Sequence, residues 1–169
     1  MKKIVILLLV VAFHKVLPAQ NANLIKNAKI TFSFLSNEVD GSVSGFSSSS
    51  VIDLKEPGNT VLKGSVATET LKTGNFLRDW SLKGGKYFDT ETYPKISFRS
   101  TSVEATDSGF DVEGKLTIKK TTLPIRISFI KTGTNLTGKT TINAYDYGIK
   151  VKKKKEDNLV AVQFVFNLK

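Results

Sequence analysis

The sequence contains no cysteine and only one histidine, and these two absences exclude several classes of protein. Without cysteine there is no disulfide framework, no thiolate metal site and no thiol nucleophile. The one histidine, His14, lies in an N-terminal segment that we expect to be removed. A chain without either residue cannot form a histidine-based catalytic triad or a usual zinc site. The sequence therefore argues against an enzyme and against a bound metal or other cofactor.

The N-terminal segment has the layout of a secretory signal peptide. Lys2 and Lys3 form a short cationic region, residues 4–13 are an unbroken apolar run, and Ala19 is a small residue at the expected cleavage point. The apolar run is shorter than the ~20 residues that a membrane-spanning helix needs. We therefore expect cleavage after Ala19, with Ala22 as the alternative, and a protein located in the periplasm or outside the cell.

The remaining length suits one domain. We predict a signal peptide over residues 1–19 and a single domain over residues 20–169, which is long enough for one hydrophobic core. The formal charge is +10, and removing the three lysines of the predicted leader leaves +7. A basic surface attracts nucleic acid or anionic lipid head groups, and export favours the lipid. We expect no transmembrane segment in the mature protein, because no later stretch is apolar enough to span.

Apolar and polar residues alternate through most of the chain, which is typical of β-strands. Phe110, Val112, Leu116 and Ile118 alternate with polar or charged residues, so that one set faces inward and the other faces water. The same alternation recurs in residues 30–34, 96–98, 123–129 and 136–142. Turn signals separate these runs at short intervals, which indicates an antiparallel meander folded as a sandwich or a barrel. Residues 73–93 depart from the pattern and predict a short helix followed by an ordered loop.

Two glycines and the final strand bear on the interior. Gly114 and Gly138 lie on inward faces, where glycine either bends a barrel strand or leaves volume that a side chain would fill. An eight-stranded barrel is just wide enough to be packed solid or to hold one small ligand. Residues 159–168 are apolar on both faces, so we expect something to cover the outer face. A homodimer is one way to provide that cover.

Short enzyme-like motifs occur in the wrong context. Residues 133–140 match the phosphate-binding loop G-x-x-x-x-G-K-[ST], but a strand pattern follows where that loop requires a helix. Residues 128–133 match S-x-x-K and K-T-G of penicillin-interacting enzymes, but both motifs share one lysine on one predicted strand. The basic run 152–155 has no interleaved aromatic residues, so we expect no nucleic acid and favour a solvated hairpin tip over a lipid contact.

Paired carboxylates are the remaining route to catalysis. Asp79, Asp89 and Asp146 are the candidates for a hydrolase of this kind. Asp79 directly follows Arg78 and Asp89 lies in the predicted loop, so structural pairing or helix capping is the favoured role for both.

An ordered set of short motifs resembles the YceI-like family. The set comprises residues 43–46, 73–75, 78–79, 82, 88–89, 93–98, 100, 114–118, 123–125 and 146–149. The resemblance implies an all-β, antiparallel, eight-stranded lipocalin-like barrel that binds a polyisoprenoid or similar lipid chain. The chain departs from the family pattern at Ser81, where a histidine is usual, at Ala144, where an arginine is usual, and at Lys120, where a glycine is common. The first two departures remove any head-group contact that this histidine or arginine would make, whereas the apolar pattern is intact.

The resemblance also implies which residues hold the lipid. An apolar tail in water costs about 0.8 kcal/mol for each exposed CH₂, so an apolar tube can hold it with few polar contacts. We expect the tube to be lined by Phe32, Phe34, Phe98, Leu116, Ile118, Ile125, Ile127 and Phe129. We expect Phe76, Trp80 and Phe88 to form a lid or mouth. Polyisoprenoid, isoprenoid quinone and fatty-acyl chains all suit such a tube, and the alternative is a solid-core β module that acts in envelope interaction or adhesion.

Overall fold

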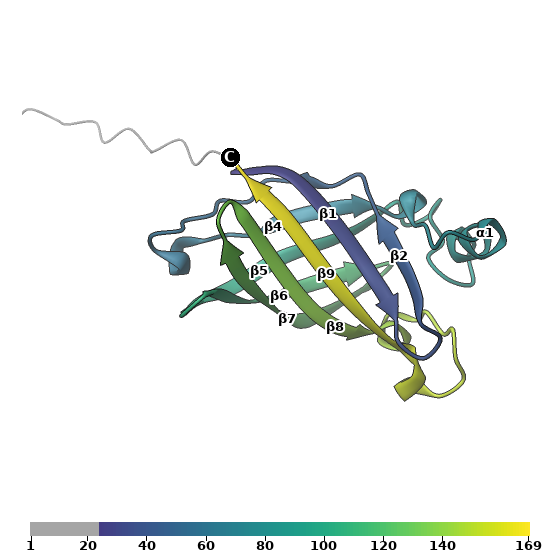
Figure 1. The fold of residues 1–169 in the computed structure, drawn as a ribbon. Coiled ribbons are helices and arrows are strands. Elements are labelled where there is room, and N and C mark those ends of the chain that lie inside the picture. The colour runs from purple at the N-terminus through teal and green to yellow at the C-terminus, as the bar shows by residue number, and fades with distance from the viewer. Residues whose placement is uncertain (1–23) are drawn as a thin grey trace, which may run out of the picture.

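The computed structural model describes residues 24–169, so the predicted signal peptide lies outside the described residues (Figure 1). The strands are β1 (Ile25–Phe34), β2 (Val39–Val43), β3 (Ser47–Ser48), β4 (Lys63–Ala67), β5 (Lys95–Thr106), β6 (Gly109–Ile118), β7 (Thr121–Thr132), β8 (Asn135–Asn143) and β9 (Leu159–Leu168). The helical elements are α1 (Phe76–Lys83) and the 3-10 turns η1 (Pro57–Asn59), η2 (Thr68–Thr70), η3 (Ala144–Tyr147) and η4 (Lys155–Asn158). None of the helices in residues 24–169 has the length and apolar character to cross a membrane.

All neighbouring strands pair antiparallel in one sheet with the order β2-β1-β9-β8-β7-β6-β5-β4-β3. The two edge strands, β2 and β3, are consecutive in the chain, and the sheet curls strongly so that they lie close together (Figure 1). The predicted antiparallel lipocalin-like barrel with one short helix is therefore confirmed. The strand count is nine where eight were expected.

The extra strand results from a kink between β2 and β3. Gly45 has a φ of +68°, a left-handed conformation that glycine adopts at little cost. Next to it, the carbonyl of Ser44 accepts a hydrogen bond of 3.0 Å from the amide of Ala67 at the end of β4. The kinked segment thus pairs with β1 on one side and β4 on the other, so the edges of the sheet meet. Counted as one strand, β2 and β3 give the eight strands that the resemblance implies.

The burial pattern follows the predicted alternation. On β6, Phe110, Val112, Gly114 and Ile118 are buried, whereas the intervening Glu113 is exposed. On β9, the even-numbered residues from 160 to 168 face inward. Figure 1 shows β9 on the outer wall with no element of residues 24–169 lying over it. The expected cover for its outer face is therefore not found within the described chain.

Glycines on the inner face give room to phenylalanine rings of the neighbouring strand. A Cβ atom at Gly138 would lie 2.8 Å from Cδ1 of Phe129, and one at Gly114 would lie 2.6 Å from Cε2 of Phe98. Each ring therefore lies flat over a glycine of the adjacent strand. The glycines do not leave empty volume themselves, which corrects one of the two expectations for Gly114 and Gly138. Their effect is to keep large rings against the wall.

The connections between strands gather at two ends of the barrel (Figure 1). One end, here called the helix end, carries residues 35–38, 68–94 with α1, 119–120 and 144–158. The opposite end carries residues 49–62, 107–108 and 133–134 together with the C-terminus. A cluster of buried residues fills the barrel toward this opposite end: Ile25, Ile52, Leu62, Phe110, Val112, Ile127, Phe129, Leu136, Phe166 and Leu168. This largest buried cluster lies away from α1, and two smaller ones, which include Leu71 and Ile149, lie nearer the helix end.

Candidate ligand cavity

The barrel contains an apolar cavity of about 250 Å³. Its wall is built from β1, β2 and β4–β9, with Leu82 and Phe88 contributed by α1 and the loop that follows it. The buried cluster described above includes Ile127, Phe129 and Phe166, which also line the cavity, so this cluster forms its floor. Because the wall is almost entirely hydrocarbon, the cavity is suited to an apolar ligand segment rather than to a polar one.

The mouth of the cavity lies at the helix end. Asn37, Arg78 and Val151 are exposed residues of the lining that belong to connections at this end of the barrel, whereas Lys63 and Ser97 are exposed on β4 and β5. Thr73 and Leu82 lie in the same region and also line the cavity. The cavity is therefore bounded by a packed floor on one side and by loops and α1 on the other.

Nine of the eleven predicted site residues line this cavity. They are Phe32, Phe34, Phe88, Phe98, Leu116, Ile118, Ile125, Ile127 and Phe129. They come from β1, β5, β6, β7 and the loop after α1, and the barrel brings them together because each lies on the inward face of its element.

Phe76 and Trp80 do not line the cavity, and their expected place at a lid or mouth stays a prediction. Their side chains are 80% and 74% exposed. Residues four apart share one face of a helix, so Phe76 and Trp80 lie on one face of α1, and Arg78 and Leu82 lie on another. It is this second face that lines the cavity. The apolar residue of α1 at the mouth is therefore Leu82.

Several residues that line the cavity were not among the site residues predicted from the sequence. Val160, Val162 and Phe164 line the cavity from β9. Their period-two signal was obscured because the intervening positions of β9 include apolar residues as well. Ile96 and Ile142 also line the cavity, and their alternation with polar neighbours was the signal that could have identified them.

Two of the three departures from the family pattern, Ala144 and Ser81, fall in different surroundings. Ala144 is buried and lines the cavity at the start of η3. Its methyl group keeps this part of the wall apolar. Ser81 is exposed on α1 and is not part of the lining. The replacement at position 144 therefore changes the cavity, and the one at position 81 does not.

A polar network fixes α1 beside the mouth. The Asp79 carboxylate accepts hydrogen bonds from the backbone amide (2.7 Å) and the hydroxyl (2.6 Å) of Thr73. The guanidinium of Arg78 donates to the hydroxyl and the carbonyl of Thr73 at 2.6 and 2.9 Å. Asn75 caps the helix by accepting a bond from the amide of Arg78. The Thr73 hydrogen bonds lower the pKa of Asp79, because they favour its charged form.

The other candidate catalytic carboxylates lie apart from the lining. Asp89 lies in the loop after α1 with a left-handed backbone, and Asp146 pairs with Lys155 at η4. Neither of these residues nor Asp79 lines the cavity. Among residues 24–169, no group of three or more His, Cys, Asp or Glu side chains is placed to hold a metal ion.

One buried hydroxyl lies next to the cavity wall without a hydrogen-bond partner in the described part of the chain. Tyr147 is 3% exposed and packs with Ile118, Ala144 and Ile149, which line the cavity. Burial raises the pKa of Tyr147 to about 12, because the phenolate is poorly solvated there.

The fold and the cavity define the chain as an antiparallel barrel with an apolar interior cavity. Residues 23–168 match the model of the YceI-like domain, and the chain belongs to this family. A UPF0312 protein of Pseudomonas aeruginosa is 27% identical over 121 residues, which are 66% of this chain and 63% of that protein. A UPF0312 protein of Yersinia pestis is 29% identical over 93 residues, 55% of this chain and 48% of the relative. The matched region thus spans less than two thirds of the length of these relatives.

Solved structures share the fold. BcnA of Burkholderia cenocepacia has a TM-score of 0.71 at 19% identity, covering 82% of this chain and 94% of BcnA. The YceI protein of Campylobacter jejuni has a TM-score of 0.65 at 16% identity, covering 78% and 85% of the two chains. A polyisoprenoid binding domain from Saccharophagus degradans has a TM-score of 0.53 at 14% identity, covering 84% and 93%. At these identities the likeness concerns the fold.

Proposed function

We propose that this chain is a lipid-binding protein of the periplasm or the extracellular space, and that it holds the apolar tail of an amphiphilic lipid inside the barrel. The observation that carries this proposal is the hydrocarbon-walled cavity of about 250 Å³ with a packed floor and a mouth beside α1. The Saccharophagus neighbour, described as a polyisoprenoid binding domain, supports the same class of ligand. The signal-peptide pattern of residues 1–19 supports export.

Solvation alone supplies the free energy of binding. Each CH₂ group moved from water into the cavity contributes about 0.8 kcal/mol, so a ten-carbon segment contributes roughly 8 kcal/mol before the loss of chain entropy. The cavity is slightly smaller than the ~300–1,000 Å³ of common small-molecule pockets. It therefore suits a single extended tail, and a longer polyisoprenoid or quinone tail requires the Phe rings of the wall to move or the tail to extend through the mouth.

The mouth offers polar groups for a head group. Arg78 and Thr73 lie on the cavity lining where the loops begin. A guanidinium has five N–H donors, and the two bonds to Thr73 use two of them. We propose that an anionic or strongly polar head group stays at this mouth while the tail enters the barrel. The Asp79 carboxylate is engaged by Thr73 and acts in structure, so we propose no catalytic step.

Mass spectrometry of a solvent extract from the purified protein tests the proposal. We expect a co-purified lipid with one or more long apolar tails. Val162→Phe adds a ring to the cavity wall, so it should reduce the lipid content severalfold. Val165→Phe is the matched control, since it makes the same change on the outward face of the same strand, and it should leave the lipid content unchanged. Equal lipid in both variants would mean that the lipid is not held against Val162, and no lipid in repeated preparations of folded protein would favour the solid-core module instead.

A further inference from the structure

The outer face of α1 exposes three large apolar side chains. Phe76, Leu77 and Trp80 are 80%, 73% and 74% exposed. Single exposed apolar side chains are common on soluble proteins, but three within two turns of one short helix form a contiguous patch. The helix has no buried residue, and the hydrogen bonds of Thr73, Arg78 and Asp79 hold it in place. The patch is therefore not needed for folding and points to a partner.

The position of the patch relates it to the cavity mouth. Figure 1 shows α1 projecting beyond the strands at the helix end of the barrel. The inner face of the helix contributes Arg78 and Leu82 to the cavity lining, and the opposite face carries the patch. Whatever covers the patch therefore comes close to the mouth.

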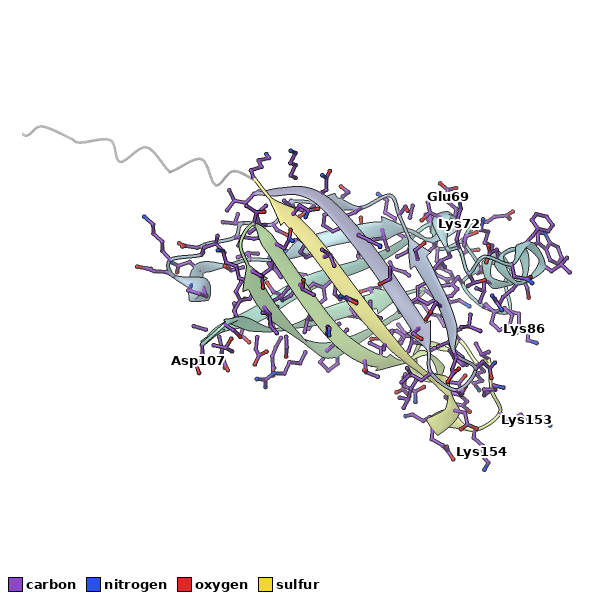
Figure 2. The ribbon with its side chains drawn as sticks, viewed as in Figure 1. Glu69, Lys72, Lys86, Asp107, Lys153 and Lys154 are labelled. Atoms are coloured by element: carbon purple, nitrogen blue, oxygen red, sulfur yellow. The ribbon has the colours of Figure 1, made fainter. Side chains whose placement is uncertain are left out.

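Basic side chains lie at the same end of the barrel as the patch. Figure 2 shows Lys72 and Lys86 near α1, with Glu69 beside Lys72, and Lys153 and Lys154 on the connection between β8 and β9, whereas Asp107 lies at the opposite end. All four lysines are exposed. An aromatic and aliphatic patch flanked by lysines has the chemistry of a surface that binds anionic lipid bilayers, because the rings enter the interface and the lysines approach the phosphates.

We propose that the helix end docks on an anionic lipid bilayer. Phe76, Leu77 and Trp80 insert at the level of the head groups and upper acyl chains, and the lysines contact lipid phosphates. Docking on the bilayer does not depend on the cavity, but the transfer of a lipid that docking would serve rests on the proposed lipid-binding function. With the mouth held against the membrane, a lipid tail passes between bilayer and barrel without crossing water, which removes most of the solvation barrier.

Trp80 is the only tryptophan of the chain, so its emission reports on this helix alone. Phosphatidylcholine vesicles with phosphatidylglycerol should shift the emission to shorter wavelength, and brominated acyl chains should quench it. Vesicles of phosphatidylcholine alone should have a weaker effect, and high salt should reduce the binding to anionic vesicles. An emission that does not change with anionic vesicles would overturn the proposal.

Variants separate the apolar and the basic contributions. Phe76→Ser with Leu77→Ser keeps the tryptophan reporter and should weaken vesicle binding at least about tenfold. Leu54→Ser, which changes an exposed apolar residue at the opposite end, is the matched control and should have no effect. Lys153→Glu with Lys154→Glu should weaken binding to anionic vesicles only, whereas Lys29→Glu on the wall of β1 should not. Equal binding by the double serine variant and the wild type would contradict the proposed surface.

Two further measurements distinguish other outcomes. If the wild type sediments as a dimer and the double serine variant as a monomer, the patch binds a second copy of the chain, and the docking proposal is overturned. The lipid content of the double serine variant separates docking from the cavity. Weakened vesicle binding with the co-purified lipid retained supports both proposals, whereas vesicle binding by a protein that never contains lipid supports docking and contradicts the lipid-binding function.

Discussion

The ring of Phe129 on β7 occupies the space that a side chain at Gly138 on β8 would need. The two residues are directly paired across the strands, and a Cβ atom at Gly138 would lie 2.8 Å from Cδ1 and Cζ of the ring. Phe32 and the directly paired Gly41 share this relationship, and the ring of Phe98 likewise occupies the space beside Gly114, which lies diagonally across from it. Each glycine lets a ring lie along the wall, so the centre of the barrel stays open even though its strands carry large aromatic residues.

Gly138→Ala should therefore displace the Phe129 ring toward the centre of the barrel. We expect a loss of about 1–3 kcal/mol in the free energy of unfolding, the usual cost of overpacking a core, and a lower lipid content. Urea unfolding with extraction of the purified protein measures both. Gly85→Ala is the control, because an added methyl group meets no atom within 4 Å there, and it should leave both quantities unchanged. If Gly138→Ala leaves both the free energy of unfolding and the lipid content unchanged, the Phe129 ring does not depend on the space beside the glycine.

Asp79 should stabilise the fold in a pH-dependent way. Its folded pKa lies below the ordinary value of 3.8 because of the Thr73 hydrogen bonds. The stabilisation is therefore fully present above pH 3.8 and is lost as the pH falls through the folded pKa. Asp79→Asn should unfold at a lower temperature than the wild type at neutral pH, and the difference should shrink in acid. Melting temperatures measured across this range test the expectation.

A double-mutant cycle tests whether the Thr73 hydroxyl is the group through which Asp79 stabilises the fold. Thr73→Val removes the hydroxyl that donates to Asp79, so the effects of Thr73→Val and Asp79→Asn should be less than additive. Strictly additive effects would mean that the hydroxyl of Thr73 does not contribute and that the carboxylate acts through the backbone amide of Thr73 or through other groups.

The unpaired hydroxyl of Tyr147 should weaken the fold slightly. A buried polar group without a partner costs about 1–3 kcal/mol, so Tyr147→Phe should stabilise the protein by about 1 kcal/mol in urea unfolding. The folded pKa of about 12 lies above the ordinary value of 10.0, so the unfolded chain ionises first. Ionisation of this group therefore leaves the free energy of unfolding unchanged below pH 10 and lowers it as the pH rises toward 12. The free energy of unfolding of Tyr147→Phe should fall less steeply than that of the wild type in this alkaline range. If Tyr147→Phe is less stable than the wild type, the hydroxyl has a partner.

The sequence predicted the barrel wall better than the mouth, for a physical reason. Alternation on β6 and β7 identifies inward residues directly, since one face contacts the core and the other contacts water. Phe76 and Trp80 were expected at a lid or mouth, whereas the structure leaves both exposed to solvent, and the face of α1 that lines the cavity carries Arg78 and Leu82. Local sequence contains no sign of that inversion, because the contacts of Thr73 with Asp79 orient the helix.

The packing of rings on glycines could not be predicted either. It depends on which residues of neighbouring strands lie opposite each other, and turn lengths set that register rather than any single strand. Gly138 and Gly114 were identified as unusual inward positions from alternation alone. That Phe129 and Phe98 occupy their space became apparent only once the register was known.

Ala144 offers a test of what the cavity selects. It lines the wall at the helix end, at a position where the resemblance to the family implies an arginine. An arginine at this position would have to extend its charge toward the mouth, because an unpaired charge among apolar side chains is costly. Ala144→Arg should therefore raise the share of anionic head groups among the co-purified lipids, as measured by mass spectrometry. Ser81→His introduces the other residue usual in the family at an exposed position off the lining, so it should leave the lipid composition unchanged. The same lipids in Ala144→Arg and wild type would mean that position 144 does not contact the bound molecule, and the ligand would then lie deeper in the barrel, against Phe129 and Phe166.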